Sequence, residues 1–311
     1  MVVLAVLLLG LMTLGLVLAG LPARVHRWAT SVIHFGSARS GASPLDQGVF
    51  ASGACVAYPP TLGENRKTVF LDAGHGGIDP GAVGTTTSGR QVDESTVNLA
   101  IEVDTASLLR ARGFRVVVSR TQDTTVAHLV QADTSGGVLS LEGAHDDVVA
   151  RDMCANLAGA DALIGIYMDA STSSQNAGSV TVYDAARPFA HSNARLAGLL
   201  QTSVLTAMNA DGWQIPDDGA VPDAGYGSSV GDPSAGGLAA EAATYDHLLL
   251  IGPADAGFFS SPSAMPGAVI EPLYLTDPFE ASIATNPGDQ EVVAQGIASA
   301  VRQFLLTSPA S

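Results

Sequence analysis

Cysteine, lysine and aromatic residues are scarce in this chain. Its 311 residues include 2 cysteines, and aromatic side chains make up 5% of them. Lysine is nearly absent, so 14 basic side chains compare with 30 acidic ones and the formal net charge is −16. Nucleic acids and anionic membrane surfaces are bound through basic patches. We therefore expect no nucleic-acid partner and no purely electrostatic attachment to a membrane.

The two cysteines, Cys55 and Cys154, are predicted to form a disulfide if the protein is exported. Two cysteines in an oxidising compartment favour one cross-link. It would close a loop of about 100 residues, worth up to ~4.7 kcal/mol in the chain-entropy model. The alternative is a pair of buried thiols. A metal role is disfavoured, because neither cysteine has a partner at ligand spacing.

The amino terminus carries one long apolar run. Residues 2–21 are uncharged, and about 20 such residues suffice to span a bilayer. No basic segment precedes the run, and no clear small-residue cleavage site follows it. Arg24 and Arg27 do follow it. By the positive-inside rule, basic residues after the run favour the wrong orientation for export. We expect residues 1–22 to be a signal peptide or a single-helix membrane anchor. Residues 23–66 would be a linker and N-terminal extension, and the protein would be exported to the cell envelope or secreted.

Strand and helix patterns alternate from residue 67 onward. The expected strands are 68–71, 114–119, 162–168, 179–183, 248–251 and 268–270. The expected helices are 95–112, 146–157, 192–208 and 290–306. This alternation predicts an α/β fold, with a mostly parallel sheet flanked by helices on both faces, in a single domain over residues 67–308. Residues 211–237 are rich in Gly, Pro, Asp and Ser and predict a loop or insertion.

A histidine in a glycine-rich loop is the strongest local signal. The predicted strand 68–71 continues into Asp-Ala-Gly-His-Gly-Gly, which places His75 at the carboxyl end of a strand. Open α/β sheets bind ligands at that edge, and glycine lets the backbone approach a ligand closely. An imidazole there can bind metal or transfer protons. The alternative is a tight turn with an incidental surface histidine.

Four segments together resemble one known family. Residues 71–84 read Leu-Asp-Ala-Gly-His-Gly-Gly-Ile-Asp-Pro-Gly-Ala-Val-Gly. Glu94 then opens a predicted helix, Tyr167 lies near the end of a predicted strand, and Glu271 directly follows another. In this order and spacing the segments resemble the zinc-dependent N-acetylmuramoyl-L-alanine amidases, the family-3 cell-wall amidases, from about residue 68 to about residue 306. The run Leu-Thr-Asp-Pro-Phe-Glu at 275–280 is similar to actinobacterial members.

The resemblance implies a metallohydrolase that acts on peptidoglycan. It would cut the amide between the lactyl group of N-acetylmuramic acid and L-alanine of the stem peptide. His75 and Glu94 would be zinc ligands, and Glu271 would be the general base. This agrees with the chemistry of catalytic zinc, which takes three protein ligands and leaves one position for water. A nearby carboxylate can then move the water proton to the leaving amine.

One position departs from the family pattern. The stretch Gly-Ile-Tyr-Met-Asp at 165–169 places Tyr167 where the family has its second zinc-binding histidine. Three alternatives follow: Tyr167 or Asp169 completes the zinc site, the chain is an inactive amidase-like protein that binds peptidoglycan or regulates other hydrolases, or a different metal or substrate is used. The remaining histidines in the catalytic region lie in no recognisable ligand motif and are expected to be ordinary surface or core residues: His128, His145, His191 and His247. No sequence feature specifies an oligomeric state.

Overall fold

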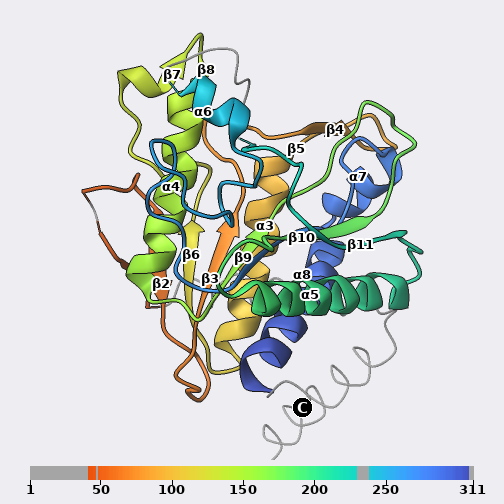
Figure 1. Ribbon diagram of the computed structural model, residues 1–311. Coiled ribbons are helices and arrows are strands. Elements are labelled where there is room, and N and C mark those ends of the chain that lie inside the picture. The colour runs from red at the N-terminus through yellow and green to blue at the C-terminus, as the bar shows by residue number, and fades with distance from the viewer. Residues whose placement is uncertain (1–40, 47, 230–237, 308–311) are drawn as a thin grey trace, which may run out of the picture.

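An eight-stranded sheet forms the centre of the protein (Figure 1). The computed structural model describes residues 41–46, 48–229 and 238–307. In spatial order the strands are β1 (Ser43–Pro44), β2 (Ala54–Tyr58), β6 (Arg115–Arg120), β3 (Thr68–Ala73), β9 (Ala162–Ile166), β12 (Gly267–Glu271), β10 (Ser179–Tyr183) and β11 (Asp217–Pro222). Strands β6, β3, β9 and β12 run parallel, while β2 and β10 pair antiparallel to β6 and β12.

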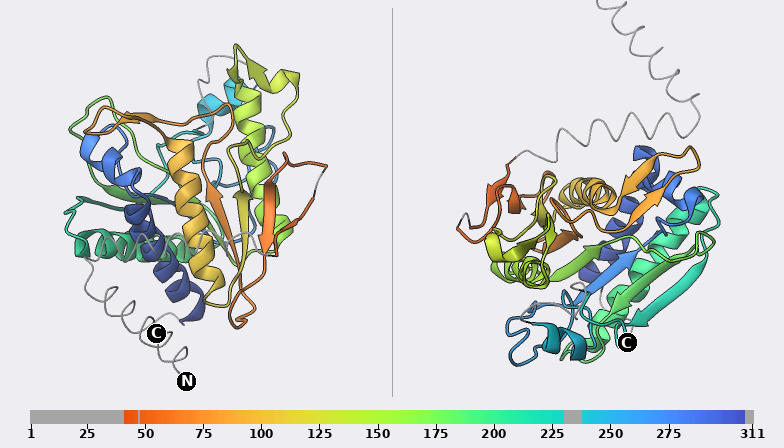
Figure 2. Two further views of the ribbon diagram at one scale, coloured as in Figure 1. Left: turned by 180° about the vertical axis from the view of Figure 1, so that it is seen from behind. Right: turned by 90° about the horizontal axis from the view of Figure 1, so that it is seen from above.

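Helices cover both faces of this sheet, as the views in Figure 2 show. One face packs against α3 (Glu94–Arg110), α5 (Ala190–Ala210) and α8 (Pro287–Leu306), and the other packs against α4 (Leu141–Ala158). The shorter elements are α6 (Ala239–Thr244), α7 (Pro278–Ala284), η1 (Gln131–Asp133), and the paired strands β4 (Val83–Thr85) with β5 (Gln91–Asp93) and β7 (Thr134–Ser135) with β8 (Val138–Leu139). The predicted α/β fold with a mostly parallel sheet is therefore confirmed.

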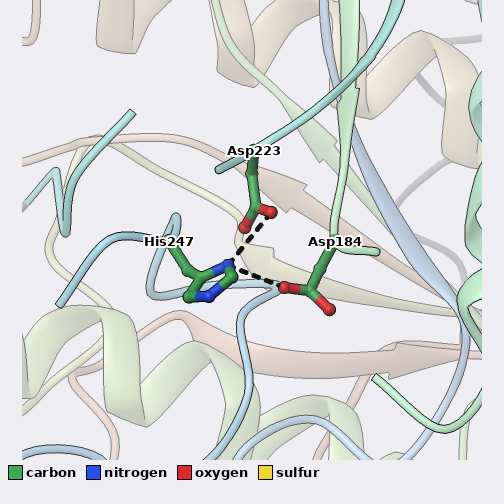
Figure 3. A group of neighbouring side chains, drawn as sticks. All are labelled: Asp184, Asp223 and His247. Atoms are coloured by element: carbon green, nitrogen blue, oxygen red, sulfur yellow. Dashed lines mark hydrogen bonds and ion pairs between the residues drawn. The ribbon is translucent and has the colours of Figure 1, made fainter. Parts of the chain in front are cut away.

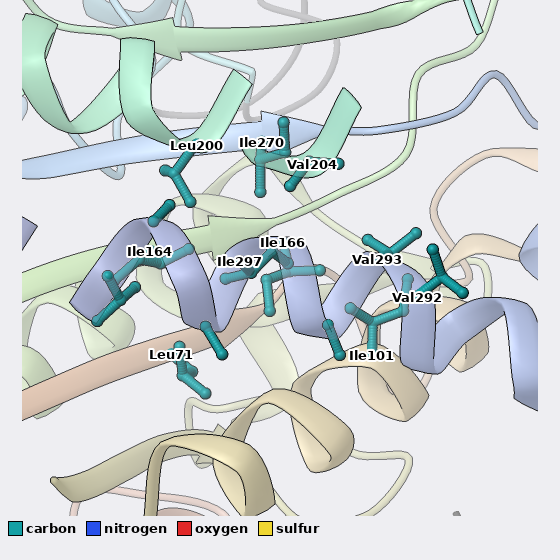
Figure 4. Packing of buried hydrophobic residues seen from close by; sticks show 14 of the residues in the cluster. Leu71, Ile101, Ile164, Ile166, Leu200, Val204, Ile270, Val292, Val293 and Ile297 are labelled. Atoms are coloured by element: carbon teal, nitrogen blue, oxygen red, sulfur yellow. The ribbon is translucent and has the colours of Figure 1, made fainter. Parts of the chain in front are cut away.

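The central strands are apolar on both faces. Successive strand residues point to opposite sides, so Leu71 joins the cluster with α3, α5 and α8, while Phe70 joins the cluster beneath α4. Figure 4 shows Leu71 and Ile164 from the sheet packed with Ile101, Leu200 and Ile297 from the three helices. Each such buried side chain contributes ~1.5–3 kcal/mol relative to exposure. Because helices pack on both faces of the sheet, the ends of its strands are held in fixed positions.

Two local predictions were wrong. The segment 211–237, expected as a loop or insertion, is not all loop, because it contains β11, an edge strand that pairs only with β10 among the described strands. Its Asp and Gly residues disfavour strands locally, and tertiary pairing overrides that preference. Residues 248–251, expected as a strand, form a turn whose apolar side chains are buried. The sequence pattern alone does not show whether such a short apolar run forms a buried strand or another buried segment.

The predicted disulfide between Cys55 and Cys154 is confirmed. It joins β2 to α4, with the Cα atoms 5.6 Å apart and a sequence separation of 99. Strands β1 and β2, which lie within the predicted extension 23–66, are thus both paired into the sheet, and β2 is also cross-linked to α4. Among the described residues no helix is long and apolar enough to cross a bilayer. The predicted signal peptide or anchor at 1–22 lies outside them.

Candidate active site

The carboxyl ends of three neighbouring strands form one side of a pocket. His75 follows β3, Tyr167 follows β9 and Glu271 is the last residue of β12. Because these strands are parallel and adjacent, their ends meet at one edge of the sheet. The pocket lining combines these side chains with a largely apolar wall: His75, Asp79, Leu139, Ala144, Asp147, Val148, Arg151, Tyr167, Ser228, Ser229, Leu248, Leu249, Leu250, Val269 and Glu271. The structure therefore brings the predicted ligand His75 and the predicted base Glu271 together.

His75 is held between two carboxylates. Its backbone adopts a φ of 61°, in the left-handed region, and the following glycines also have positive φ. Its Nδ1 lies 2.8 Å from Asp79 Oδ2, and its Nε2 lies 3.2 Å from Glu94 Oε2. Burial alone would lower the pKa of His75, but the Glu94 and Asp79 carboxylates raise it to about 10. The site thus stabilises positive charge at this ring.

Glu94 is the first residue of α3 and is almost fully buried. Its Oε2 accepts a hydrogen bond from the Ala82 amide at 2.8 Å, and its Oε1 accepts one from the Met168 amide at 2.9 Å. Burial alone would raise the pKa of Glu94, but His75 and these amides outweigh it and hold the pKa below its usual range. Glu94 is therefore a fixed, ionised carboxylate aimed at His75.

Two buried arginines, Arg151 and Arg120, hydrogen-bond to the loop that carries His75. Arg151 donates to Asp72 Oδ1 at 2.6 Å, to the carbonyl of Ala73 at 2.8 Å and to the carbonyl of His75 at 2.9 Å. Arg120 donates to the carbonyls of Ala73 and Gly74, each at 3.1 Å. Hydrogen bonds to charged donors are stronger than neutral ones. These two guanidinium groups therefore fix the backbone that presents the imidazole.

Glu271, on β12, lies near His75 and Glu94. Burial, the neighbouring Asp169 and then Glu94 raise its pKa to about 8, while His75 opposes the rise. A carboxyl group with a pKa near the working pH suits proton transfer in both directions. The arrangement thus places a carboxyl group able to accept and return a proton beside His75.

The Tyr167 hydroxyl bonds to Asp72 and not to His75 or Glu94. It donates to Asp72 Oδ2 at 3.0 Å, and the Tyr167 ring packs edge-on against His75 with the ring centroids 5.5 Å apart. Burial and the Asp72 carboxylate hold the pKa of Tyr167 well above its usual value. A Cβ atom at Gly74 would lie 2.2 Å from the Tyr167 ring, so glycine is required there. A neutral phenol that already donates to Asp72 is not a zinc ligand of the usual kind.

Asp169, the other predicted third ligand, lies next to Glu271 and has partners of its own. Its Oδ1 accepts a hydrogen bond from the Ala170 amide at 2.6 Å, and the Tyr274 hydroxyl also bonds to its carboxylate. Burial raises its pKa, and its charge in turn helps to raise the pKa of Glu271. Its contacts therefore connect it to the proton-transfer side of the pocket.

Of the predicted metal-ligand positions, His75 and Glu94 are placed so that both could contact one metal ion. The 3.2 Å between His75 Nε2 and Glu94 Oε2 is close to the separation of two ligands bonded at ~2.0–2.2 Å to one tetrahedral ion. Asp79 at Nδ1 supplies the outer carboxylate that usually orients a metal-binding histidine. At the third position the Tyr167 hydroxyl donates to Asp72 Oδ2 instead. Within the described part of the chain, these residues form no compact group of three metal-ligand side chains.

Comparison with known proteins identifies the family. The family model described as N-acetylmuramoyl-L-alanine amidase matches residues 69–303. The chain belongs to this amidase family. The match spans the sheet from β3 to α8 and so includes every residue of the pocket described above.

Solved amidase structures share the fold. One from Clostridium difficile 630 is 25% identical with a TM-score of 0.52, covering 78% of this chain and 98% of that chain. The catalytic domain of CwlV from Bacillus (Paenibacillus) polymyxa var. colistinus is 23% identical with a TM-score of 0.51, covering 77% and 98%. The CwlD amidase of Clostridioides difficile, solved in complex with the GerS lipoprotein, is 20% identical with a TM-score of 0.56, covering 77% and 98%.

A curated relative matches only a short stretch. The uncharacterized protein YqiI of Bacillus subtilis (strain 168) is 42% identical over 57 residues, which is 18% of this chain and 25% of that protein. The chain thus spans about a quarter of the length of this relative. This short similarity carries no activity by itself.

Some residues of the amidase site were not predicted from the sequence. Asp79 was not among the predicted site residues, yet its carboxylate lies 2.8 Å from Nδ1 of His75. Its position four residues after the histidine was the available signal. Arg120 was not predicted either, because its contacts with the loop carbonyls depend on the pairing of β6 with β3.

Glu102 is a fully buried acid beneath the same loop. Its Oε1 accepts hydrogen bonds from the Ala73 amide at 3.0 Å and from the Ser119 amide at 3.3 Å. Burial and the nearby Asp72 raise its pKa from 4.5 to about 8, although Arg120 opposes the rise. Between pH 4.5 and about 8, Glu102 holds a proton in the folded protein and has lost it in the unfolded chain. Stability due to Glu102 is therefore present at low pH and is lost as the pH rises from 4.5 to about 8.

Replacing Glu102 with glutamine should remove this pH dependence. Glutamine keeps the acceptor for the Ala73 amide and carries no charge to bury. We expect Glu102→Gln to be more stable than the parent at pH 8.5 by on the order of a few kcal/mol, and to differ little at pH 5. Urea unfolding at both pH values measures this. The exposed Glu64→Gln is the matched control, and equal pH dependence in the Glu102 variant and the control would contradict the assignment.

Proposed function

We propose that the protein hydrolyses the amide bond between N-acetylmuramic acid and the L-alanine of peptidoglycan stem peptides. The observation that carries this proposal is the convergence of His75, Glu94 and Glu271 at one sheet edge, at the positions where the amidase family has two zinc ligands and its proton-transfer glutamate. The apolar wall around Leu248 and Leu250 limits the access of bulk water to these groups. Substrate and reaction therefore follow from the family and from the site together.

Glu271 carries the proton-transfer steps. In its ionised form the carboxylate accepts a proton from the water that attacks the lactyl carbonyl, and a C–O bond forms. The protonated carboxyl then donates to the nitrogen of L-alanine as the C–N bond breaks, leaving a lactyl carboxylic acid and a free amine. The pKa of Glu271, about 8, makes both forms accessible near neutral pH.

His75 and Glu94 would hold a zinc ion, and Asp79 would orient the imidazole. When bound there, zinc supplies Lewis acidity for the scissile carbonyl and lowers the pKa of water. Tyr167 or Asp169 remains the proposed third ligand, and either would have to give up its present partner, Asp72 or Tyr274. We also propose that the protein works outside the cytoplasm, in the envelope or secreted, because the Cys55–Cys154 disulfide requires an oxidising compartment.

A second candidate function is an inactive amidase-like protein that binds peptidoglycan or regulates other hydrolases. Tyr167 favours it, because the phenol occupies the third ligand position and donates to Asp72. This candidate shares the pocket and the substrate with the first. It differs in the absence of hydrolysis.

Release of stem peptide from purified peptidoglycan separates the two candidates. The oxidised full chain, supplied with one equivalent of zinc, is expected to release soluble peptides with new amino groups on alanine, and a chelator is expected to stop the release. Zinc content is measured in the same sample. Zinc bound without any release, together with co-sedimentation of the protein with peptidoglycan, would support the inactive binding protein instead.

A further inference from the structure

A second group of metal-ligand side chains lies apart from the His75 site. Asp184 follows β10, Asp223 follows β11, and His247 lies beyond α6 (Figure 3). The imidazole Nδ1 lies 3.0 Å from Asp184 Oδ2 and 3.2 Å from Asp223 Oδ1. Both aspartates are 0% exposed, whereas the His247 side chain keeps 23% of its surface exposed. Two buried carboxylates therefore converge on one nitrogen of a partly exposed imidazole.

The hydrogen bond between His247 and Asp223 leaves one carboxylate oxygen of Asp184 without a donor. Nδ1 of His247 makes its hydrogen bond with Asp223 Oδ1, whose other oxygen accepts from the Leu248 amide at 3.1 Å. Asp184 Oδ1 accepts from the Ala186 and Arg187 amides at 2.9 and 2.7 Å, but its buried Oδ2 accepts no hydrogen bond and points at His247. A buried carboxylate oxygen with no donor is costly.

The nearest cation does not resolve this imbalance. The Arg187 guanidinium donates to the carbonyls of Ile251, Gly252 and Ser263 rather than to Asp184 Oδ2. Asp184 Oδ2 therefore receives no hydrogen bond from Arg187 either.

We infer that Asp184, Asp223 and His247 bind a divalent cation of the zinc class. Each residue offers one ligand atom, and the three atoms lie within 4.8 Å of one another. One imidazole nitrogen and two carboxylate oxygens are a ligand set that suits Zn²⁺ and related borderline ions. The ion replaces the proton on Nδ1 and gives a positive partner to Asp184 Oδ2, which accepts no hydrogen bond. The exposed edge of His247 provides the path of entry.

The site connects three segments around the pocket. Asp184 and Asp223 lie at the ends of two neighbouring strands, and His247 directly precedes the Leu248–Leu250 stretch that lines the active-site wall. A cation there fixes that wall against the sheet, at a place that shares no residue with the His75–Glu94 pair. Its role is structural, and its binding is independent of catalysis.

Zinc binding in a background without the first site tests this inference. The full chain carrying His75→Ala is dialysed with Zn²⁺, and zinc content and thermal unfolding are measured. We expect about one equivalent of zinc and a zinc-dependent rise in Tm. Adding His247→Ala should abolish both, whereas adding the exposed His191→Ala should change neither.

A conservative variant distinguishes a loss of zinc binding from misfolding. Asp184→Asn keeps the size and the acceptor for the Arg187 amide but removes the charge, and we expect it to weaken zinc binding at least tenfold while the metal-free Tm stays close to that of the background. Zinc bound equally by the His247→Ala and His191→Ala variants would overturn the inference. So would a His75→Ala background that binds no zinc. Either result leaves the proposed amidase function untouched, because the pocket residues differ.

Discussion

Glu271→Gln is expected to slow the release of stem peptides by ~10²–10⁴-fold, the usual contribution of a general acid–base group. Glutamine keeps the size of the side chain at the end of β12 and removes its ability to accept and return a proton. The carboxyl is suited to that role because burial and Asp169 raise its pKa to about 8. Initial rates of amine release from muropeptides measure the effect.

Two controls separate proton transfer from other roles of Glu271. Glu64→Gln makes the same chemical change at an exposed site and should keep the parent rate. Zinc content of Glu271→Gln should equal that of the parent, since the ligands proposed are His75 and Glu94. A variant that loses zinc together with activity would make Glu271 a ligand, and a variant with the parent rate would remove it from the mechanism.

Tyr167→His is expected to raise zinc affinity at least about tenfold and to raise the hydrolytic rate. Metal sites are sensitive to single contacts, since even outer partners of the ligands contribute ~10–100-fold. An imidazole at this position follows β9 and lies against His75, where the phenol ring now packs. It would add an imidazole nitrogen as a third donor beside His75 Nε2 and the Glu94 carboxylate. Zinc titration and amine release measure the two effects.

Tyr167→Phe is the matched control for this change. Phenylalanine keeps the ring that packs over Gly74 and removes the hydroxyl that donates to Asp72. If the hydroxyl is no ligand, zinc affinity in Tyr167→Phe equals that of the parent. A loss of zinc in this variant would make Tyr167 the third ligand. Equal activity of Tyr167→His and the parent would show that the parent site is already complete and would exclude the inactive alternative.

The parts of the site that were predictable are those with local or topological signals. The run of residues 71–84 identified His75, because a glycine-rich loop after a buried strand has few other uses. Glu94 was predictable because it opens a helix within the same family pattern. The position of Glu271 beside them follows from the pairing of β12 with β9, which parallel strand–helix alternation implies.

The remaining features depend on contacts between distant segments. The direction of the Tyr167 hydroxyl is set by Asp72 on β3, and nothing in residues 165–169 indicates it. The strand β11 has poor local strand character and forms because β10 offers an open edge. His247 was expected to be an ordinary histidine, since its partners Asp184 and Asp223 lie on other elements at no recognisable ligand spacing.

Identification of the cleaved bond tests the central claim most directly. Muropeptides are incubated with the purified parent chain, Tyr167 in place and zinc supplied, and the products are analysed by mass spectrometry. The account predicts muramic acid with a free lactyl carboxyl group and a stem peptide that begins with L-alanine, both absent when Glu271→Gln is used. Muropeptides left intact by a folded, zinc-loaded parent, or cut at any other bond, would contradict it.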